Sequence, residues 1–147
     1  MSHPAPAAPH TIEELPLLAR ACEPVIHIAA RRIEVAHEAA GGAPLELRFQ
    51  PYQALRLTTM DCFVVNGPDE YTPGRLTCRR VSPWLDALRA ALHETDPRAR
   101  FMDRALHFTL PAGDDVLEVA AWKVEIRLGA GWVAYPAEGG GGATGAS

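Results

Sequence analysis

Asp61 is the residue whose position most suggests chemistry. It lies in the segment TTMDCF, and a strand running through Leu55 and Phe63 would place its carboxylate on the apolar side of a sheet. A carboxylate buried in that way needs hydrogen-bond partners, or its charged form is disfavoured. Asp61 is therefore a candidate general base or ligand-binding carboxylate. In the alternative, the strand ends near Met60, and Asp61 faces solvent or caps a turn.

Histidines are natural proton-transfer partners for such a carboxylate, because imidazole titrates near neutral pH. His27, His37 and His107 all fall in segments with strand alternation, and each taken singly is expected on a solvated face. In an enzyme, Asp61 would be the base, and His107 or His27 would be its acid or orienting partner. No HxH, HxxxH or HExxH spacing occurs, so the sequence predicts no metal site, and nothing in it predicts a cofactor.

The cysteines do not indicate thiol chemistry. Cys22, Cys62 and Cys78 are widely spaced without a CxxC pair, which predicts reduced thiols rather than a disulfide framework or a zinc ribbon. Cys62 adjoins Asp61, but neighbouring side chains on a strand point to opposite faces. A nucleophilic thiol also needs a nearby histidine or cation, which the local sequence does not supply. We therefore expect Cys62 and Cys78 to be small core residues.

Arginines give the middle of the chain a basic character. Arg75 and Arg79 share one strand parity and could together bind an anion or an acidic partner, although a solvated strand face is the simpler expectation. Acidic residues interleave with the arginines, which argues against a nucleic-acid-binding stripe. Trp122 is a further candidate binding residue, because tryptophan and arginine are enriched at interfaces.

Motifs of two common enzyme classes are missing from the chain. The glycines form no phosphate-cradling loop, and no GxSxG elbow is present. A nucleotide-driven enzyme and a typical serine hydrolase are therefore disfavoured.

Length and composition predict one acidic domain. The chain has 147 residues, a net charge of -4 and 48% hydrophobic residues, which suit a single self-sufficient core. Pro- and Ala-rich residues 1–10 and Gly-rich residues 139–147 are expected to be flexible tails around a domain of residues 11–138. No targeting signal or membrane-length apolar run is visible, so we expect a cytoplasmic protein without membrane or nucleic-acid partners. The abundance of Ala, Gly, Pro and Arg suggests a high-GC bacterium as its source.

One helix is clearly marked in the sequence. Ser82 can serve as its N-cap and Pro83 as its first residue, and an apolar stripe then extends over residues 82–94. A short helix is expected over residues 16–22, and one or two helical turns are expected after Pro97.

Strands are expected over most of the remaining chain. Alternation predicts a strand over residues 45–50 that Pro51 ends, a long strand over residues 54–65 before an Asn66-Gly67 turn, and a strand over residues 75–81. Two segments on either side of the PAGDD loop, residues 106–110 and 116–128, are expected to form a hairpin.

Two similar segments, VIHIAARRIEV from Val25 and VLEVAAWKVEI from Val116, each change apolar parity just after an Ala pair. We expect a bulge at Ala29-Ala30 and another at Ala120-Ala121, which would bend both strands. These elements predict an α+β fold: a curved, mostly antiparallel sheet of about six or seven strands, packed on one main helix with additional short helices.

Two functions fit these features. A small binding or interaction module, of accessory, regulatory or immunity type, would engage a protein or a small ligand through a face or edge of its sheet. The alternative is a small single-domain enzyme with Asp/His acid–base chemistry in a cavity between sheet and helix. A closed cavity receiving both Asp61 and a histidine would favour the enzyme, and Asp61 at the surface of a filled core would remove it. A homodimer through a sheet edge is compatible with either function.

Overall fold

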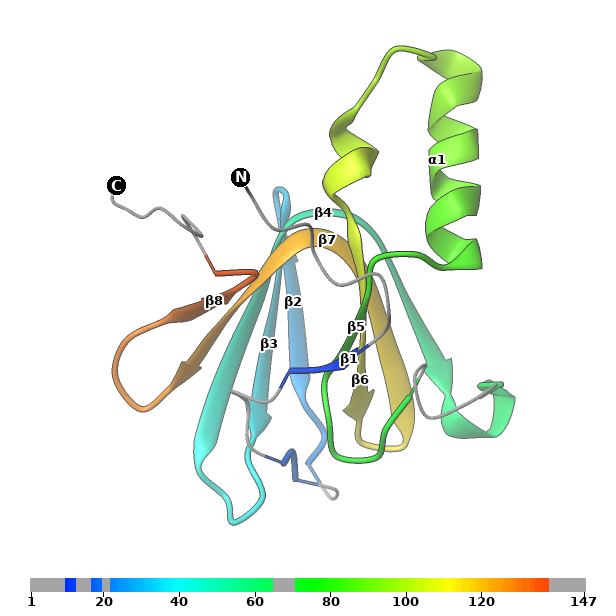
Figure 1. Ribbon diagram of the computed structural model, residues 1–147. Coiled ribbons are helices and arrows are strands. Elements are labelled where there is room, and N and C mark those ends of the chain that lie inside the picture. The colour runs from blue at the N-terminus through cyan, green and yellow to red at the C-terminus, as the bar shows by residue number, and fades with distance from the viewer. Residues whose placement is uncertain (1–9, 13–16, 20–21, 65–70, 138–147) are drawn as a thin grey trace.

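An antiparallel sheet with one main helix forms the molecule. The computed structural model describes residues 10–12, 17–19, 22–64 and 71–137. In this part of the chain the strands have the order β1-β5-β6-β7-β4-β3-β2, and β8 pairs with β7 on the same edge as β6 (Figure 1). The predicted α+β fold is confirmed. The elements are β1 (His10–Thr11), β2 (Val25–Ala29), β3 (Arg32–Glu38), β4 (Pro44–Thr59), the 3-10 helix η1 (Met60–Cys62), β5 (Thr77–Arg79), α1 (Pro83–Thr95), the 3-10 helix η2 (Phe101–Arg104), β6 (Leu106–Ala112), β7 (Asp115–Leu128) and β8 (Val133–Tyr135).

The long strands β4 and β7 connect the two halves of the sheet. They pair with each other from Leu45 opposite Leu128 to Thr59 opposite Asp115. Both arch over the molecule, so that the half containing β2 and β3 and the half containing β5 and β6 enclose the main core between them (Figure 1). Phe49 of β4 accordingly contacts Phe108 of β6, with ring centroids 5.4 Å apart, although these two strands are not paired.

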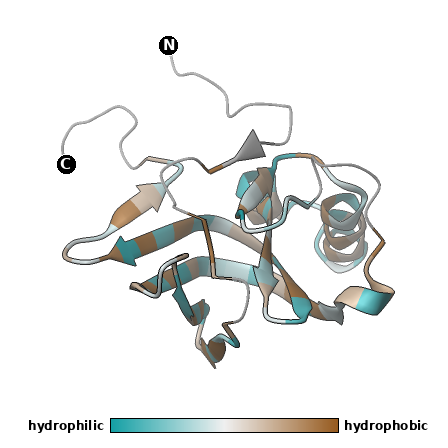
Figure 2. Ribbon diagram, turned by 90° about the horizontal axis from the view of Figure 1, so that it is seen from below, coloured by the Kyte–Doolittle hydropathy of each residue, from teal (hydrophilic) through white to brown (hydrophobic). Residues whose placement is uncertain are grey.

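Alternating hydropathy directs one set of side chains into this core. Along β4 and β7, hydrophobic and hydrophilic residues follow each other in bands (Figure 2). Leu45, Leu47 and Phe49 are buried and their neighbours in β4 are more exposed, as the alternation predicts. In β7 the set of core residues changes parity between Ala121 and Val124, which is the expected change.

The position of the bulge differs from the expectation. β7 itself has no extra residue at Ala120-Ala121. The register shift lies in the partner strand β4, between Tyr52 and Ala54, directly opposite this Ala pair. The parity pattern locates the bend correctly, but it cannot show which of two paired strands contains the extra residue.

Two expected strand boundaries are wrong. Residues 25–35 form two strands, β2 and β3, joined by a tight turn at residues 30–31, where Arg31 adopts a φ of 63°. No Gly or Asn marks this turn, so its flanking alternation resembles one bulged strand. Pro51 does not end β4, because it lies at an irregularity of the sheet where neither β3 nor β7 gives it a register partner.

Several other boundaries also move. The strand expected over residues 54–65 ends at Thr59, and the strand expected over residues 75–81 is limited to β5. Residues 17–19 are not helical, since Leu18 forms a β-bridge with Ala39. The expected tails lie outside the described residues except for His10 in β1, and so does the Asn66-Gly67 turn.

Helix α1 begins as predicted and covers the outer face of the sheet at one end. The Ser82 Oγ atom accepts a hydrogen bond from the Leu85 N–H at 3.1 Å, and Pro83 is the first helical residue. Leu85 is fully buried in a second, smaller core that includes Ala120 of β7. The helical turns expected after Pro97 correspond to η2. No helix in the described part of the chain is long and apolar enough to cross a membrane.

The capping interaction leads to a first prediction. Ser82→Ala leaves the buried Leu85 N–H without its acceptor and should lower the free energy of unfolding by about 1–2 kcal/mol. Urea denaturation measures this change. Thr95→Ala, which removes an exposed hydroxyl at the other end of α1, is the control and should change the free energy by less than about 0.5 kcal/mol. Equal losses in the two variants would contradict a capping role for Ser82.

Candidate functional site

Four neighbouring strands each direct one ionisable side chain toward the sheet face below α1. These residues are Arg79 of β5, His107 of β6, Glu118 of β7 and Arg56 of β4, and we call them the charged row. Arg79 is the cross-strand partner of His107, and Arg56 is the partner of Glu118. Cross-strand partners project from the same face of a sheet, so strand register alone brings these groups together.

Glu118 is the centre of the charged row. Its Oε1 atom accepts a hydrogen bond from Arg56 Nε at 2.7 Å, and its Oε2 atom accepts from Arg56 Nη2 at 3.2 Å and from His107 Nε2 at 2.7 Å. The side chain is only 3% exposed. Burial alone would raise the pKa of Glu118, but the hydrogen bonds from His107 and Arg56 outweigh it and lower the pKa to about 2. Glu118 is therefore ionised at neutral pH.

His107 is held through both of its ring nitrogens. Because Nε2–H donates to Glu118, the Nδ1 atom is an acceptor, and it lies 2.8 Å from Ser82 Oγ and 3.1 Å from Arg79 Nη2. Ser82 can donate to it, since the same hydroxyl oxygen accepts from Leu85 N–H. Burial lowers the pKa of His107, and the hydrogen bond to Glu118 does not overcome this effect. His107 is therefore neutral, with its proton on Nε2.

The chain of contacts from Ser82 through His107 to Glu118 has the connectivity of a Ser-His-carboxylate triad. The Ser82 hydroxyl nevertheless caps α1, and Ser82 is only 2% exposed. Both nitrogens of His107 and both oxygens of Glu118 already have partners. A nucleophilic hydroxyl has to reach its substrate. The Ser82 hydroxyl is buried and engaged at the start of α1, so this arrangement presents hydrogen-bonded groups rather than an accessible nucleophile.

A pocket of about 520 Å³ opens between the charged row and the first turns of α1, and we call it the helix–sheet pocket. The Trp84 ring lies edge-on to the His107 ring with centroids 4.9 Å apart, and Arg56 Cζ lies 4.3 Å from the Trp84 centroid. The four side chains of the charged row are thus combined with apolar groups in one space. The other lining residues are Thr58, Cys62, Phe63, Val64, Pro83, Trp84 and Ala87.

The structure brings together two of the residues selected from the sequence, His107 and Arg79. Asp61 is exposed on η1, because β4 ends at Thr59, and it does not line the helix–sheet pocket. His27 lies on β2 and lines a different pocket. The three residues of the expected Asp/His chemistry therefore do not share one pocket.

Arg75 and Trp122 also lie outside the helix–sheet pocket. The Trp122 indole N–H donates to the Phe101 carbonyl at 2.8 Å, and Arg104 Cζ lies 3.9 Å above its ring. These contacts attach η2 to β7. Arg75 is partly buried in the segment before β5.

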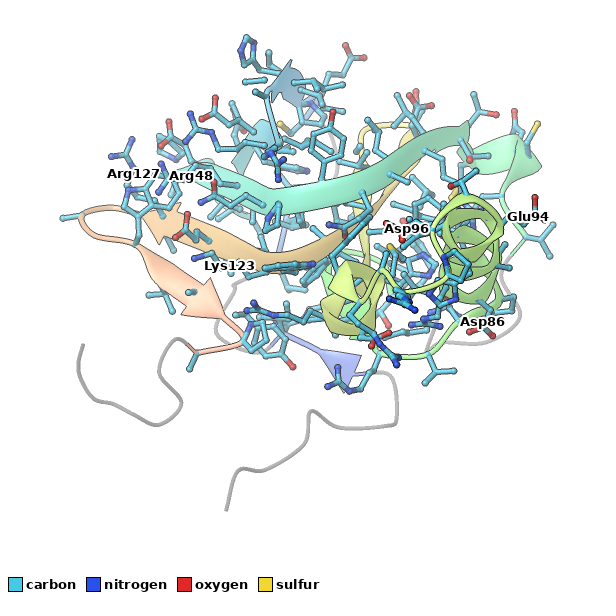
Figure 3. All side chains as sticks on the ribbon, turned by 90° about the horizontal axis from the view of Figure 1, so that it is seen from above. Arg48, Asp86, Glu94, Asp96, Lys123 and Arg127 are labelled. Atoms are coloured by element: carbon cyan, nitrogen blue, oxygen red, sulfur yellow. The ribbon has the colours of Figure 1, made fainter. Side chains whose placement is uncertain are left out.

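The pocket beside His27, of about 420 Å³, lies at the end of the sheet away from α1. Of its two arginines, Arg48 lies on β4 and Arg127 on β7. Both are far from the acidic residues labelled on α1 (Figure 3). Both approach the ring of Trp132, with Cζ atoms 3.8 Å and 5.0 Å from its centroid. Both also form ion pairs, Arg48 with Glu125 and Arg127 with Glu46. Each of these two arginines thus already has a carboxylate partner.

The cysteines divide between the core and the surface. Cys78 is buried, as expected, and burial raises its pKa to about 12. Cys62 is exposed beside the helix–sheet pocket, so the expectation that it is a core residue is wrong, because β4 ends before it. Among the described residues, no group of three or more His, Cys, Asp and Glu side chains could hold a metal ion.

Sequence reasoning missed Arg56, Glu118, Ser82 and Trp84 as site residues. Glu118 could have been found from the expected β6–β7 hairpin. A two-residue turn at residues 113–114 pairs Ala112 with Asp115, and this register puts Thr109 opposite Glu118 with His107 diagonally beside it. Arg56 had no such signal, because its place opposite Glu118 depends on the irregularity in β4.

The charged row predicts a loss of stability in acid. Since burial lowers the pKa of folded His107, the unfolded chain binds a proton near the ordinary histidine pKa of about 6.5 while the folded protein does not. The stability that neutral His107 contributes is fully present above the ordinary histidine pKa of about 6.5. It declines as the pH falls from there toward the lower pKa of His107 in the folded protein. Glu118 adds a loss of the same sign at lower pH, between its ordinary pKa of 4.5 and its folded pKa of about 2.

His107→Gln should reduce this dependence on pH. We expect the variant to be less stable than the wild type at about pH 7.5, but to lose less stability between about pH 7.5 and about pH 5. Urea unfolding at both pH values measures the difference. His27→Gln changes an exposed histidine on β2 and should keep the wild-type slope. A wild-type slope in His107→Gln would rule out a neutral, buried His107 as the cause.

Comparison with known proteins does not assign the helix–sheet pocket. No family model matches the sequence, and neither the curated proteins nor the solved structures contain a match. Its function therefore has to be inferred from the side chains that line it.

Proposed function

We propose that this protein is a small binding module whose ligand site is the helix–sheet pocket. One observation carries the proposal: the charged row is held in place by its own hydrogen bonds and faces a pocket that also has apolar lining. Ligand sites typically combine a few fixed polar groups with apolar and aromatic side chains. The pocket volume of about 520 Å³ lies within the range of small-molecule sites. A pocket of this size favours a small molecule over a protein as the ligand.

The ionisation of the charged row favours binding over acid–base catalysis. Glu118 has a pKa of about 2 and is ionised, while the pKa of His107 is lowered and its ring is neutral. A general acid or base works best with a pKa near the operating pH, whereas the pKa values of both groups lie below their ordinary values. Groups with a constant charge and fixed position are well suited to recognition, because little conformational entropy is lost when a ligand binds.

The three cysteines also bear on location. Cys22, Cys62 and Cys78 are all unpaired. Free thiols are typical of a reducing compartment, so we place the binding module in the cytoplasm.

A pocket-filling variant tests the proposal. Ala87 is exposed on α1 and lines the helix–sheet pocket, so Ala87→Phe should occupy ligand space without disturbing either core. A library of small molecules is screened against ¹⁵N-labelled protein by NMR, with the Trp84 indole N–H as reporter. We expect compounds that shift this signal in the wild type, and loss of those shifts in Ala87→Phe.

Ala90→Phe is the matched control for that screen. Ala90 is exposed on the same helix and is not among the pocket-lining residues, so this variant should respond to the same compounds as the wild type. If no compound shifts the Trp84 signal, or if the shifts persist in Ala87→Phe, the pocket is not a ligand site.

A further inference from the structure

We infer that the helix–sheet pocket takes a singly charged organic anion, a carboxylate attached to an apolar body. This inference rests on the proposed function and names the chemical class of the ligand for the same pocket. Three features support it: the Glu118 carboxylate that is already fully bonded, the exposed edge of Arg56, and the apolar surface beside it.

The ionisable groups of the site leave one guanidinium edge open. Arg56 and Arg79 are cationic, Glu118 is ionised and paired with Arg56, and His107 is neutral. A carboxylate with one negative charge matches the single guanidinium edge of Arg56, whereas a phosphate monoester carries a charge of about -1.5 to -2 at neutral pH.

Glu118 does not offer a site for a cation. Its two carboxylate oxygens accept three hydrogen bonds from Arg56 and His107, and its side chain is 3% exposed. A cationic ligand would have to displace one of these charge-assisted hydrogen bonds. The pocket thus presents guanidinium rather than carboxylate to a ligand.

Arg56 is the group that we expect to bind the anion. Its side chain is 48% exposed, and its Nη1 atom makes no hydrogen bond within the described part of the chain. Its Nε and Nη2 atoms are fixed by Glu118, and its Cζ lies 4.3 Å from the Trp84 ring centroid. The guanidinium is therefore already positioned, and a planar guanidinium edge matches the geometry of a carboxylate.

Apolar side chains provide a surface for the rest of the ligand. Phe63, Val64 and Trp84 all line the pocket, and Val64 is 73% exposed. Covering such a surface is favourable, because apolar area is removed from water. A ligand with an apolar body next to its carboxylate would contact both kinds of lining at once.

A series of naphthalene compounds with one body and different charges tests the inference. The probes are 2-naphthoate, the neutral 2-naphthamide, the cationic 2-naphthylmethylammonium and the dianionic 2-naphthyl phosphate. Dissociation constants are measured by NMR titration with the Trp84 indole N–H as reporter. We expect 2-naphthoate to bind tightest, about tenfold more tightly than the amide, as one charge-assisted hydrogen bond predicts.

Substitution of Arg56 should affect the carboxylate alone. Arg56→Gln should weaken 2-naphthoate about tenfold and leave the amide unchanged, and Arg56→Lys should recover part of the loss by restoring the charge. Arg98→Gln removes an exposed arginine that does not line the pocket and should bind like the wild type. If Arg56→Gln does not fold, added salt should weaken wild-type binding of 2-naphthoate and not of the amide.

The outcomes separate the inference from the proposed function. If none of the four probes binds and the library screen is also empty, the proposed function fails. If the amide or the ammonium compound binds as tightly as 2-naphthoate, the pocket is a ligand site but the anion inference is wrong. Tighter binding of 2-naphthyl phosphate would overturn the assignment to a singly charged carboxylate.

Discussion

The Glu118 carboxylate is an ionised group in the middle of a sheet, and it is stable there only because Arg56 and His107 donate to both of its oxygens. A buried charge without such donors would cost several kcal/mol, on the order of 3–5 kcal/mol when one partner of a buried pair is removed. His107 depends in turn on Ser82 at the start of α1. The Glu118 carboxylate therefore depends both on the register of β4, β6 and β7 and on the position of α1.

The hydrogen bonds that hold Glu118 and His107 also limit the chemistry of the helix–sheet pocket. A histidine and a carboxylate in contact usually suggest proton transfer, but here burial lowers the pKa of His107, and the hydrogen bonds from His107 and Arg56 outweigh burial and lower the pKa of Glu118. The row presents the exposed guanidinium of Arg56 to the pocket, beside the ring of Trp84. In the function that we propose, its hydrogen bonds make this buried polar network a fixed recognition surface.

Sequence reasoning was most successful where the determining signal is local. The start of α1 followed from the Ser82-Pro83 pair, and the β6–β7 hairpin followed from alternation on both sides of a turn. Sequence reasoning failed where the local structure depends on contacts with other parts of the sheet. The turn before Arg32 has no typical turn residue, and Pro51 is tolerated because it lies where the register of β4 is irregular and has no partner in β3 or β7. Arg56 reaches Glu118 only through pairing of strands distant in the sequence, which alternation does not encode.

The protonation state of the His107 ring tests the central claim most directly. Long-range ¹H–¹⁵N correlation spectra distinguish the two neutral tautomers from the imidazolium ion, and can be followed from about pH 7.5 to about pH 5. The structure predicts a neutral ring with its proton on Nε2, unchanged as the pH passes the ordinary histidine pKa of about 6.5. A ring that becomes imidazolium near that pH, or one that carries its neutral proton on Nδ1, would contradict the account.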